Sequence, residues 1–274
     1  MDESGVPKYE EHFTAYIDLL GFSEFSTGAD DITRLNVLAF LVSVVGLRGE
    51  FNVQSTPEQT GTITYIKPAV STFSDHIVIS YPLEQISAST GFDEQRTALS
   101  VLHNFNRLLT RIASAALGIG FLIRGGATIG KLYHSGGVIF GEALVEAYQI
   151  ESRTSVYPRV VLSSKVYSRE NWMKSSMLAL RKSTDGLYYF DYFSMLVLSS
   201  VPPGADWNKN MKAWFEHVIG LTAHNLKNLE ATGKLTELSK WAWFAHEFRS
   251  ALERLPAEAL KAFGLSLNAI PWTN

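Results

Sequence analysis

Short apolar runs alternate along this chain with longer segments in which apolar residues recur every three or four positions. The first run, residues 15–23, is too short for a convincing helix and predicts a central strand that ends in a tight turn at Gly21. Asp18 lies in the middle of the strand, where a buried carboxylate is costly unless a partner offsets its charge. A strand carboxylate beside a glycine turn suits a divalent cation that holds a phosphate. Capping of the next helix by Asp18 is the structural alternative.

The remaining pattern predicts an α+β protein. Helices are expected over residues 30–47, 93–118, 142–151, 207–230 and 235–255, and strands over 62–66, 70–74, 76–80, 121–129, 132–140, 159–162 and 187–193. We expect Gly130 and Lys131 to form a tight turn between two of these strands, and Leu99 to lie on the inner side of the helix over 93–118. Tight strand pairs predict an antiparallel sheet with helices on one face, a sandwich of the ferredoxin-like kind.

The segment 201–204, Val-Pro-Pro-Gly, is the clearest linker signal in the chain. It predicts a first domain over residues 1–200 and a helical extension over 201–274. The two long helices of the extension carry an aromatic face, which we expect to pack on the core of the first domain or on a partner subunit.

Composition narrows the possible functions. The chain has 274 residues with a net charge near −3, so no basic field favours binding to nucleic acid or to an anionic membrane surface. It contains no cysteine, which excludes disulfides, thiolate catalysis and cysteine–zinc sites. No apolar stretch reaches the roughly 20 residues that a membrane-spanning helix needs. A soluble, cytoplasmic protein is expected.

A second carboxylate, Asp75, lies at a tight turn between two apolar strands. Two carboxylates at the ends of neighbouring strands are the minimum for two divalent cations, which would neutralise a triphosphate and position an attacking oxygen. The structural alternative is that Asp75 only makes the turn, as aspartate commonly does. The adjacent His76 is expected either near the cations or exposed at the turn.

Three motifs in order resemble the class III nucleotidyl cyclases, the adenylate and guanylate cyclase family. Residues 16–23, Tyr-Ile-Asp-Leu-Leu-Gly-Phe-Ser, resemble the first metal motif of that family, and Ser74-Asp75 resembles the second. Residues 123–130 and 138–152 resemble the dimerisation arm and the helix that follows it. The resemblance spans about residues 13–193, and it identifies the first domain as a cyclase catalytic domain.

The resemblance implies a homodimer with active sites at its interface. Asp18 and Asp75 would bind two divalent cations, Mn²⁺ or Mg²⁺, with the backbone carbonyl of Leu19 as a further ligand. The turn formed by Gly21, Phe22 and Ser23 would bind phosphates. The ribose 3′-hydroxyl would then attack the α-phosphorus and release pyrophosphate.

Some positions of this sequence differ from the family's base-reading residues, and these differences affect the choice of substrate. By count, the lysine that reads purine in adenylate cyclases falls at Ser71, and the aspartate that reads the adenine amino group falls at Val138. A site without charged purine readers should lose discrimination for adenine or guanine. The combination resembles the bacterial pyrimidine cyclases of Pycsar antiphage systems, which make cyclic UMP or cyclic CMP for a partner effector. We therefore expect UTP, before CTP, as the substrate.

Other positions replace the family's transition-state residues. The asparagine and arginine of the family fall by count at Val145 and Gln149, and Gln149 donates hydrogen bonds more weakly than a guanidinium. Arg153, one helical turn later, and Arg124, in an apolar strand, are candidates to substitute. For Arg124 a buried structural ion pair is the alternative.

Two further residues are candidates for substrate binding. Lys182 is near the family's triphosphate-binding lysine, and solvation in a loop is the alternative. Phe73 is placed to stack on a base, although core packing is the more common role of a strand phenylalanine.

Three other functions stay open on the sequence alone. A purine cyclase with unusual base readers would keep the same metal site. A degenerate module would bind nucleotide and signal through its helical tail. A palm-type polymerase shares the logic of two carboxylates, but the chain lacks a basic stripe for a template.

Overall fold

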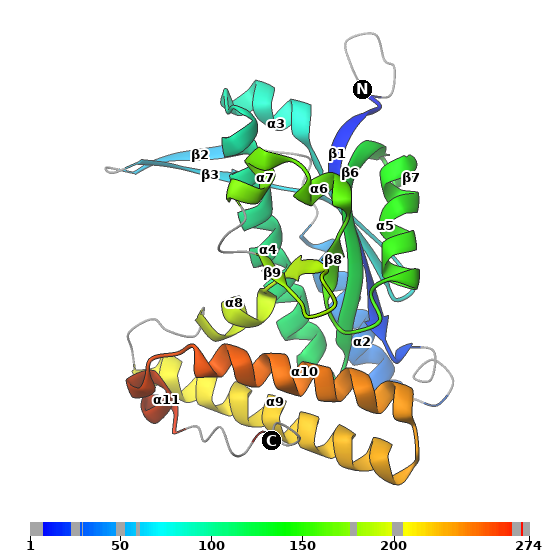
Figure 1. Cartoon of the computed structure of the whole chain (residues 1–274), viewed down its shortest axis with the longest axis vertical. Helices are drawn as coiled ribbons and strands as arrows, with labels where there is room; N and C mark the ends of the chain where they lie inside the picture. Colours follow the sequence, from blue (N-terminus) through cyan, green and yellow to red (C-terminus); the bar gives the residue numbers. More distant parts are fainter. Residues whose placement is uncertain are drawn as a thin grey trace.

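The computed structural model describes residues 8–22, 28, 30–47, 53–58, 61–175, 180–198, 205–264 and 270 (Figure 1). An 8-stranded sheet runs in the order β4-β5-β1-β6-β8-β10-β9, with β7 paired to β6, and β2 and β3 form a separate hairpin. The strands are β1 (Glu10–Leu20), β2 (Val53–Glu58), β3 (Gly61–Ile66), β4 (Ala69–Phe73), β5 (His76–Pro82), β6 (Leu122–Ser135), β7 (Val138–Phe140), β8 (Val160–Leu162), β9 (Leu180–Lys182) and β10 (Tyr188–Phe190). The helices are α2 (Asp31–Val45), α3 (Leu83–Thr90), α4 (Glu94–Gly118), α5 (Glu142–Arg153), α6 (Ser164–Tyr167), α7 (Glu170–Ser175), α8 (Tyr192–Leu198), α9 (Ala205–Ala231), α10 (Leu235–Glu253) and α11 (Ala257–Phe263).

The centre of the sheet confirms the predicted α+β, ferredoxin-like fold. Strands β4, β5, β1 and β6 lie side by side, β1 is antiparallel to both of its neighbours, and β4 and β5 form a hairpin. Helix α2 connects β1 to the strands that follow it, and α4 connects β5 to β6. This is the β-α-β-β-α-β order of that fold. Strand β8 extends the sheet in parallel to β6, so the sheet is mostly rather than wholly antiparallel.

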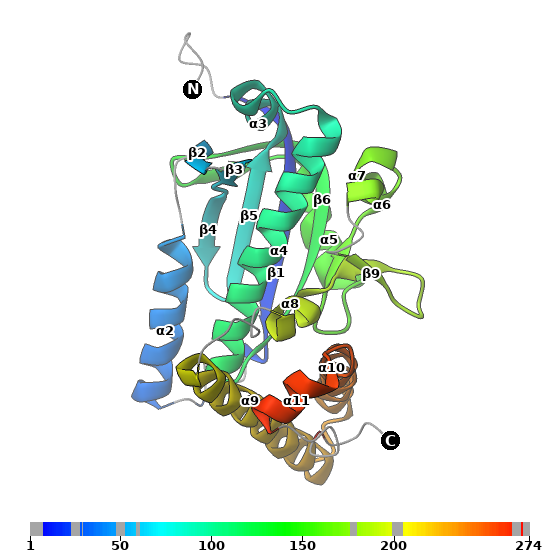
Figure 2. The same cartoon turned by 90° about the vertical axis from the view of Figure 1, so that its left-hand side faces the viewer.

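The prediction that helices cover only one face is wrong for α5. On one face Phe13 of β1 packs against Phe105 of α4, with ring centroids 5.1 Å apart. On the other face α5 lies over β6, so closely that a Cβ on Gly126 would meet the carbonyl oxygen of Ala147 at 2.3 Å. Figure 2 shows α4 in front of the sheet and α5 behind it. The glycine allows this close approach, and β1 is therefore buried on both faces.

Strand β6 differs from its prediction in one respect. The predicted turn at Gly130 and Lys131 is wrong, because β6 continues through both residues and pairs with β1 over the full length of that strand. The chain turns instead at Gly136 and Gly137, which have φ angles of 60° and 83°. Glycine adopts such angles without steric cost, and β7 then folds back on β6.

Most other predicted elements agree with the structure to within a few residues. Leu99 is an exception, since it is 52% exposed rather than on the inner side of α4. Residues 192 and 193, predicted as strand, begin the helix α8. Elements β2, α3, β9 and α11 were not predicted from the sequence. The linker signal at 201–204 lies outside the described residues.

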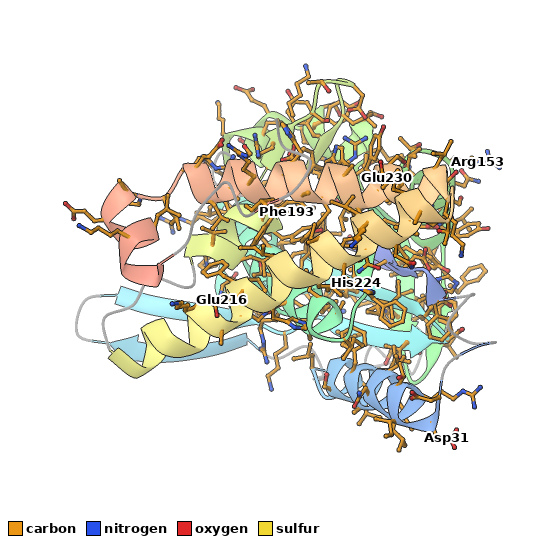
Figure 3. All side chains as sticks on the ribbon, turned by 90° about the horizontal axis from the view of Figure 1, so that it is seen from below. Asp31, Arg153, Phe193, Glu216, His224 and Glu230 are labelled. Atoms are coloured by element: carbon orange, nitrogen blue, oxygen red, sulfur yellow. The ribbon has the colours of Figure 1, made fainter. Side chains whose placement is uncertain are left out.

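The two long C-terminal helices pack against the core of their own chain, across the end of the sheet (Figure 1). Trp243 of α10 stacks on Tyr157 with ring centroids 5.6 Å apart, and Phe244 packs against Phe193 at 5.8 Å. Figure 3 shows α9 and α10 side by side, with Phe193 beneath them. The division into domains 1–200 and 201–274 stays a prediction. Among the described helices, none is long and apolar enough to cross a membrane.

Candidate metal and nucleotide site

The predicted carboxylates come together because of strand pairing. Asp18 lies near the end of β1 and pairs with His76 at the start of β5, so the β4–β5 turn that carries Asp75 lies beside it. The backbone N–H of Leu19 donates to the carbonyl oxygen of Asp75 at 3.3 Å, which ties this turn to β1. One potential ligand atom from each of Asp18, Asp75 and His76 lies within 4.8 Å of the other two.

The donor set of this cluster fits a divalent cation. His76 Nδ1 lies 3.5 Å from Asp18 Oδ1, and His76 Nε2 lies 3.6 Å from Asp75 Oδ1. His76 Nδ1 is buried without a hydrogen-bond partner among the described residues. Carboxylate oxygens are the ligands that Mg²⁺ and Mn²⁺ prefer. Asp18 and Asp75 would therefore bind the cation, and His76 would lie next to it.

Arg124 stands between two carboxylates on the same face of the sheet. Its Nε donates to Asp18 Oδ2 at 3.1 Å and forms an ion pair with Glu151 Oε1 of α5 at 2.7 Å. Burial raises the pKa of Asp18 above its ordinary value, and the guanidinium of Arg124 opposes that shift. Burial likewise raises the pKa of Glu151. The alternative of a structural ion pair for Arg124 therefore agrees with the structure, although the side chain also faces the cavity described next.

A cavity of about 240 Å³ opens at Asp18 and Asp75. One wall is formed by the end of β1 and the following turn, together with Arg124. The opposite wall is formed by Glu237, Lys240 and Trp241 of α10. That second wall could not be predicted from the sequence, because nothing in the local pattern of α10 places this helix over the end of β1.

The turn that is predicted to bind phosphate lies only partly within the described residues. Leu19, Gly21 and Phe22 line the cavity, and Gly21 has a φ of 93°, the conformation that a tight turn after the strand requires. Ser23 lies outside the described residues. The roles predicted for Leu19 and for this turn stay predictions.

Of the residues predicted to contact the base, Ser71 and Phe73 lie on the same face of the sheet as Asp18. Ser71 Oγ lies within hydrogen-bond distance of His134 Nε2, at 2.9 Å, and His134 Nδ1 lies 2.8 Å from Ser80 Oγ. Phe73 is 48% exposed rather than packed in the core, and its ring centroid lies 5.3 Å from that of His76. His134 was not predicted from the sequence, since its spacing matches no ligand motif.

Neither Ser71 and Phe73 nor the remaining predicted residues line the cavity that Asp18 and Asp75 share. Val138 is 55% exposed on β7, and Gln149 and Arg153 are exposed on α5. Figure 3 shows Arg153 at the edge of the molecule. Lys182 is exposed on β9, with its Nζ 5.4 Å from the ring centroid of Tyr188. Within one chain these side chains stay apart from the carboxylates.

Comparisons with known proteins add little beyond the chain's own geometry. No family model matches the sequence, and no curated protein matches it. Among solved structures, two of bacterial light-regulated adenylyl cyclases are similar, with TM-scores of 0.37 and 0.34, sequence identities of 12% and 13%, and coverage of 80% and 78% of this chain. The chain spans 60% and 58% of the lengths of those proteins. TM-scores this low support no inference about this chain.

Proposed function

We propose that this protein is a metal-dependent nucleotidyl cyclase that converts a pyrimidine nucleoside triphosphate, UTP before CTP, to the 3′,5′-cyclic monophosphate and pyrophosphate. One observation carries the proposal. Asp18 and Asp75, 57 positions apart in sequence, converge beside a glycine turn at a cavity, with their ligand atoms within 4.8 Å. The resemblance of the two motifs to those of class III cyclases names the reaction.

The reaction makes one bond and breaks another at the α-phosphorus. The ribose 3′-oxygen bonds to that phosphorus, the bond to the oxygen that bridges to the β-phosphate breaks, and pyrophosphate leaves with the electron pair. The 3′-hydroxyl proton passes to solvent. When bound, divalent cations supply positive charge to the triphosphate and lower the pKa of the 3′-hydroxyl. In this chain Asp18 and Asp75 would hold those cations, and the turn at Gly21 and Phe22 would present backbone N–H groups to phosphate.

The choice of a pyrimidine rests on the residues near the metal site. Ser71 offers a hydroxyl that is already within hydrogen-bond distance of His134, rather than the charged group of a purine reader. Val138 offers no hydrogen bond from its side chain. Phe73, half-exposed beside His76, presents an aromatic ring on which a base would stack. Uracil and cytosine need only a small pocket and one or two hydrogen bonds, which these residues would offer.

A homodimer is part of the proposal. The β7–α5 face, which we define by Val138, Phe140, Val145 and Tyr148, exposes between 49% and 68% of each of these apolar side chains. A cluster of this kind is typical of an interaction surface. Gln149 and Arg153 are exposed on the same helix, where they would reach the site of a second subunit.

The product would act as a second messenger. We propose that a partner effector responds to the cyclic nucleotide in antiphage defence in the cytoplasm, as the resemblance to pyrimidine cyclases implies. No nucleic acid or membrane partner is part of the proposal.

A nucleotide-binding module without turnover is the second candidate. One observation favours it: Val145 replaces a polar transition-state residue, and the nearest guanidinium on the metal face, that of Arg124, is already paired with Asp18 and Glu151. Such a module would bind the triphosphate through the same carboxylates and release it unchanged.

The mass of the product separates these functions. The purified protein is incubated with Mn²⁺ and, separately, with ATP, GTP, UTP or CTP, and the products are identified by mass spectrometry. We expect cyclic UMP or cyclic CMP from the wild type, and background levels from Asp18→Asn and Asp75→Asn. Asp31→Asn, which changes an exposed carboxylate of α2, serves as the matched control and should leave the product unchanged.

Cyclic AMP or cyclic GMP as the main product would contradict the pyrimidine assignment and leave the cyclase. Triphosphate binding that depends on Asp18, without any cyclic product, would favour the second candidate.

A further inference from the structure

The cavity at the metal site has a wall that the family resemblance does not supply, because α10 lies outside the residues that the resemblance spans. From this wall we infer that Lys240 binds the phosphate chain of the substrate, so that the C-terminal helix completes the triphosphate site within its own chain. The inference rests on the proposed function for the identity of the substrate. Its physical basis is the position and charge of Lys240.

Helix α10 is held firmly on the core by the same side that carries Lys240. Trp243 stacks on Tyr157, and Glu247 accepts hydrogen bonds from Arg181 Nη1 at 2.9 Å and from the hydroxyl of Tyr189 at 2.8 Å. Further along, Arg254 donates to Asp191 Oδ2 at 3.3 Å.

Positions 243, 247 and 254 follow Lys240 by three, seven and fourteen residues. This spacing places all four on one side of the helix. The contacts that fix α10 therefore also hold Lys240 beside the end of β1, whose residues line the same cavity. Figure 1 shows α10 lying across this end of the sheet.

Of the two cations that line the cavity, Lys240 is the one without a carboxylate partner among the described residues. The lining residues include the cations Arg124 and Lys240 and the carboxylates Asp18, Asp75 and Glu237. Arg124 is committed to Asp18 and Glu151. Within the described part of the chain, no carboxylate oxygen lies within 4.0 Å of Lys240 Nζ. Since Lys240 is only half-buried, its flexible stem can carry the ammonium toward an anion in the cavity.

The two walls of the cavity would bind different parts of the metal–triphosphate complex. The carboxylates would hold the cations on one side, and Lys240 would contact the phosphate oxygens on the other. Lys182, the lysine that the sequence favoured for this contact, instead lies on exposed β9 with Tyr188 and does not line the cavity. Of these two lysines, Lys240 is the one whose place in the fold suits the role.

The test uses inorganic tripolyphosphate as the probe, because it carries the phosphate chain without the base or the ribose. Its dissociation constant is measured by calorimetry in Mg²⁺ buffer for the full-length protein and for Lys240→Met, which keeps the length of the side chain and removes the charge. We expect binding to weaken about tenfold to hundredfold, the usual effect of losing a charge-assisted hydrogen bond. Lys240→Arg should recover most of the affinity.

The matched control is Lys227→Met, an exposed lysine of α9 that does not line the cavity. It should bind tripolyphosphate as the wild type does, and circular dichroism should show the same fold in all variants. Equal dissociation constants for Lys240→Met and the wild type would overturn the inference, whether or not the protein makes a cyclic nucleotide. A wild type that binds tripolyphosphate through Lys240 but makes no cyclic product would support the inference and contradict the proposed function.

Discussion

At the scale of single residues, Asp18 has two possible cationic partners that compete for the same carboxylate. Its Oδ2 accepts from Arg124, while its Oδ1 lies next to His76 and close to Asp75. A bound divalent cation would add positive charge at this point, so the guanidinium and the cation act on the same group.

This competition predicts the behaviour of Arg124→Met. The substitution leaves Asp18 and the buried Glu151 without their cation, so we expect the free energy of unfolding to fall by about 3 kcal/mol. Mn²⁺ would restore part of this loss by compensating Asp18. The melting temperature should therefore rise more on addition of Mn²⁺ in Arg124→Met than in the wild type. The control is Arg34→Met, which breaks an exposed ion pair with Asp31. It should change neither the free energy of unfolding nor the rise in melting temperature with Mn²⁺ appreciably. An equal response to Mn²⁺ in both proteins would show that Arg124 and the cation do not compete for Asp18.

A second residue predicts the dependence of stability on pH. His12 is buried in β1, and its burial, helped by the nearby charges of His134 and Lys8, lowers its pKa from 6.5 to about 3. Between these values the unfolded chain binds a proton that the folded chain does not. The contribution of neutral, buried His12 to the free energy of unfolding is therefore fully present above pH 6.5, and it is lost as the pH falls toward 3.

We expect this loss to reach about 2–3 kcal/mol at pH 4.5, at about 1.4 kcal/mol for each pH unit. Denaturant unfolding at several pH values from 7 to 4.5 gives the free energy of unfolding at each pH. The slope of this free energy against pH should be smaller in His12→Gln than in the wild type. His224→Gln, which changes an exposed histidine of α9 seen in Figure 3, should keep the slope of the wild type. The same slope in His12→Gln would contradict the assignment to His12.

The sequence predicted those site residues that local patterns reveal. Asp18 interrupts an apolar strand and Asp75 follows another, and each carries a motif. Lys240 and Trp241 carry no such mark, because they reach the site only through the packing of α10 across the sheet. His134 likewise meets Ser71 only after β6 and β5 have joined the sheet on either side of β1.

At the scale of elements, the contact between β6 and α5 decides how the metal face is built. Gly126 of β6 has no room for a side chain, since a Cβ there would meet Ala147 O at 2.3 Å and Ile150 Cβ at 2.6 Å. This close contact brings Glu151 of α5 within reach of Arg124.

We therefore expect Gly126→Ala to lower the free energy of unfolding by about 1–3 kcal/mol, the usual cost of overpacking. Denaturant unfolding measures the change. The matched control is Gly118→Ala at the end of α4, where a Cβ meets nothing within 4 Å and stability should hold or rise slightly. If Gly126→Ala is as stable as Gly118→Ala, α5 is not held as closely to the sheet as described.

The same strand shows why part of the fold could not be predicted. Gly130 and Lys131 have the composition of a turn, yet β1 pairs with both residues and keeps β6 extended. The pairing with β1 involves residues more than 100 positions away. The local sequence therefore does not reveal it, and the glycine predicts a turn. Helix ends with side-chain caps were easier, as at Asp30 and Asp93, each of which accepts a backbone hydrogen bond three residues later.

At the scale of the whole molecule, the apolar core does not end where the predicted first domain ends. Phe215 and Phe248 of the C-terminal helices belong to the same buried cluster as Phe13 and Phe190 of the sheet. The helices therefore bury surface of the first domain besides forming one wall of the cavity. Of the two predicted partners for their aromatic face, the core of the same chain is the one that buries it, and no partner subunit is required.

The surface that we propose for a second subunit is the β7–α5 face. Phe140 is its most exposed member at 68%, and it lies at the end of β7, where it pairs with Tyr133 of β6. We expect Phe140→Glu to convert a dimer to a monomer at micromolar concentration, because two opposed carboxylates would be buried in a symmetric contact. Sedimentation velocity measures the change in mass. Leu35→Glu on α2 is the matched control, since Leu35 is similarly exposed, at 63%, on an element away from that face.

If the active sites are shared between subunits, the monomeric Phe140→Glu variant loses cyclic nucleotide synthesis while it still binds tripolyphosphate, because Asp18, Asp75 and Lys240 all come from one chain. A monomeric variant with full activity would place the complete site within a single subunit.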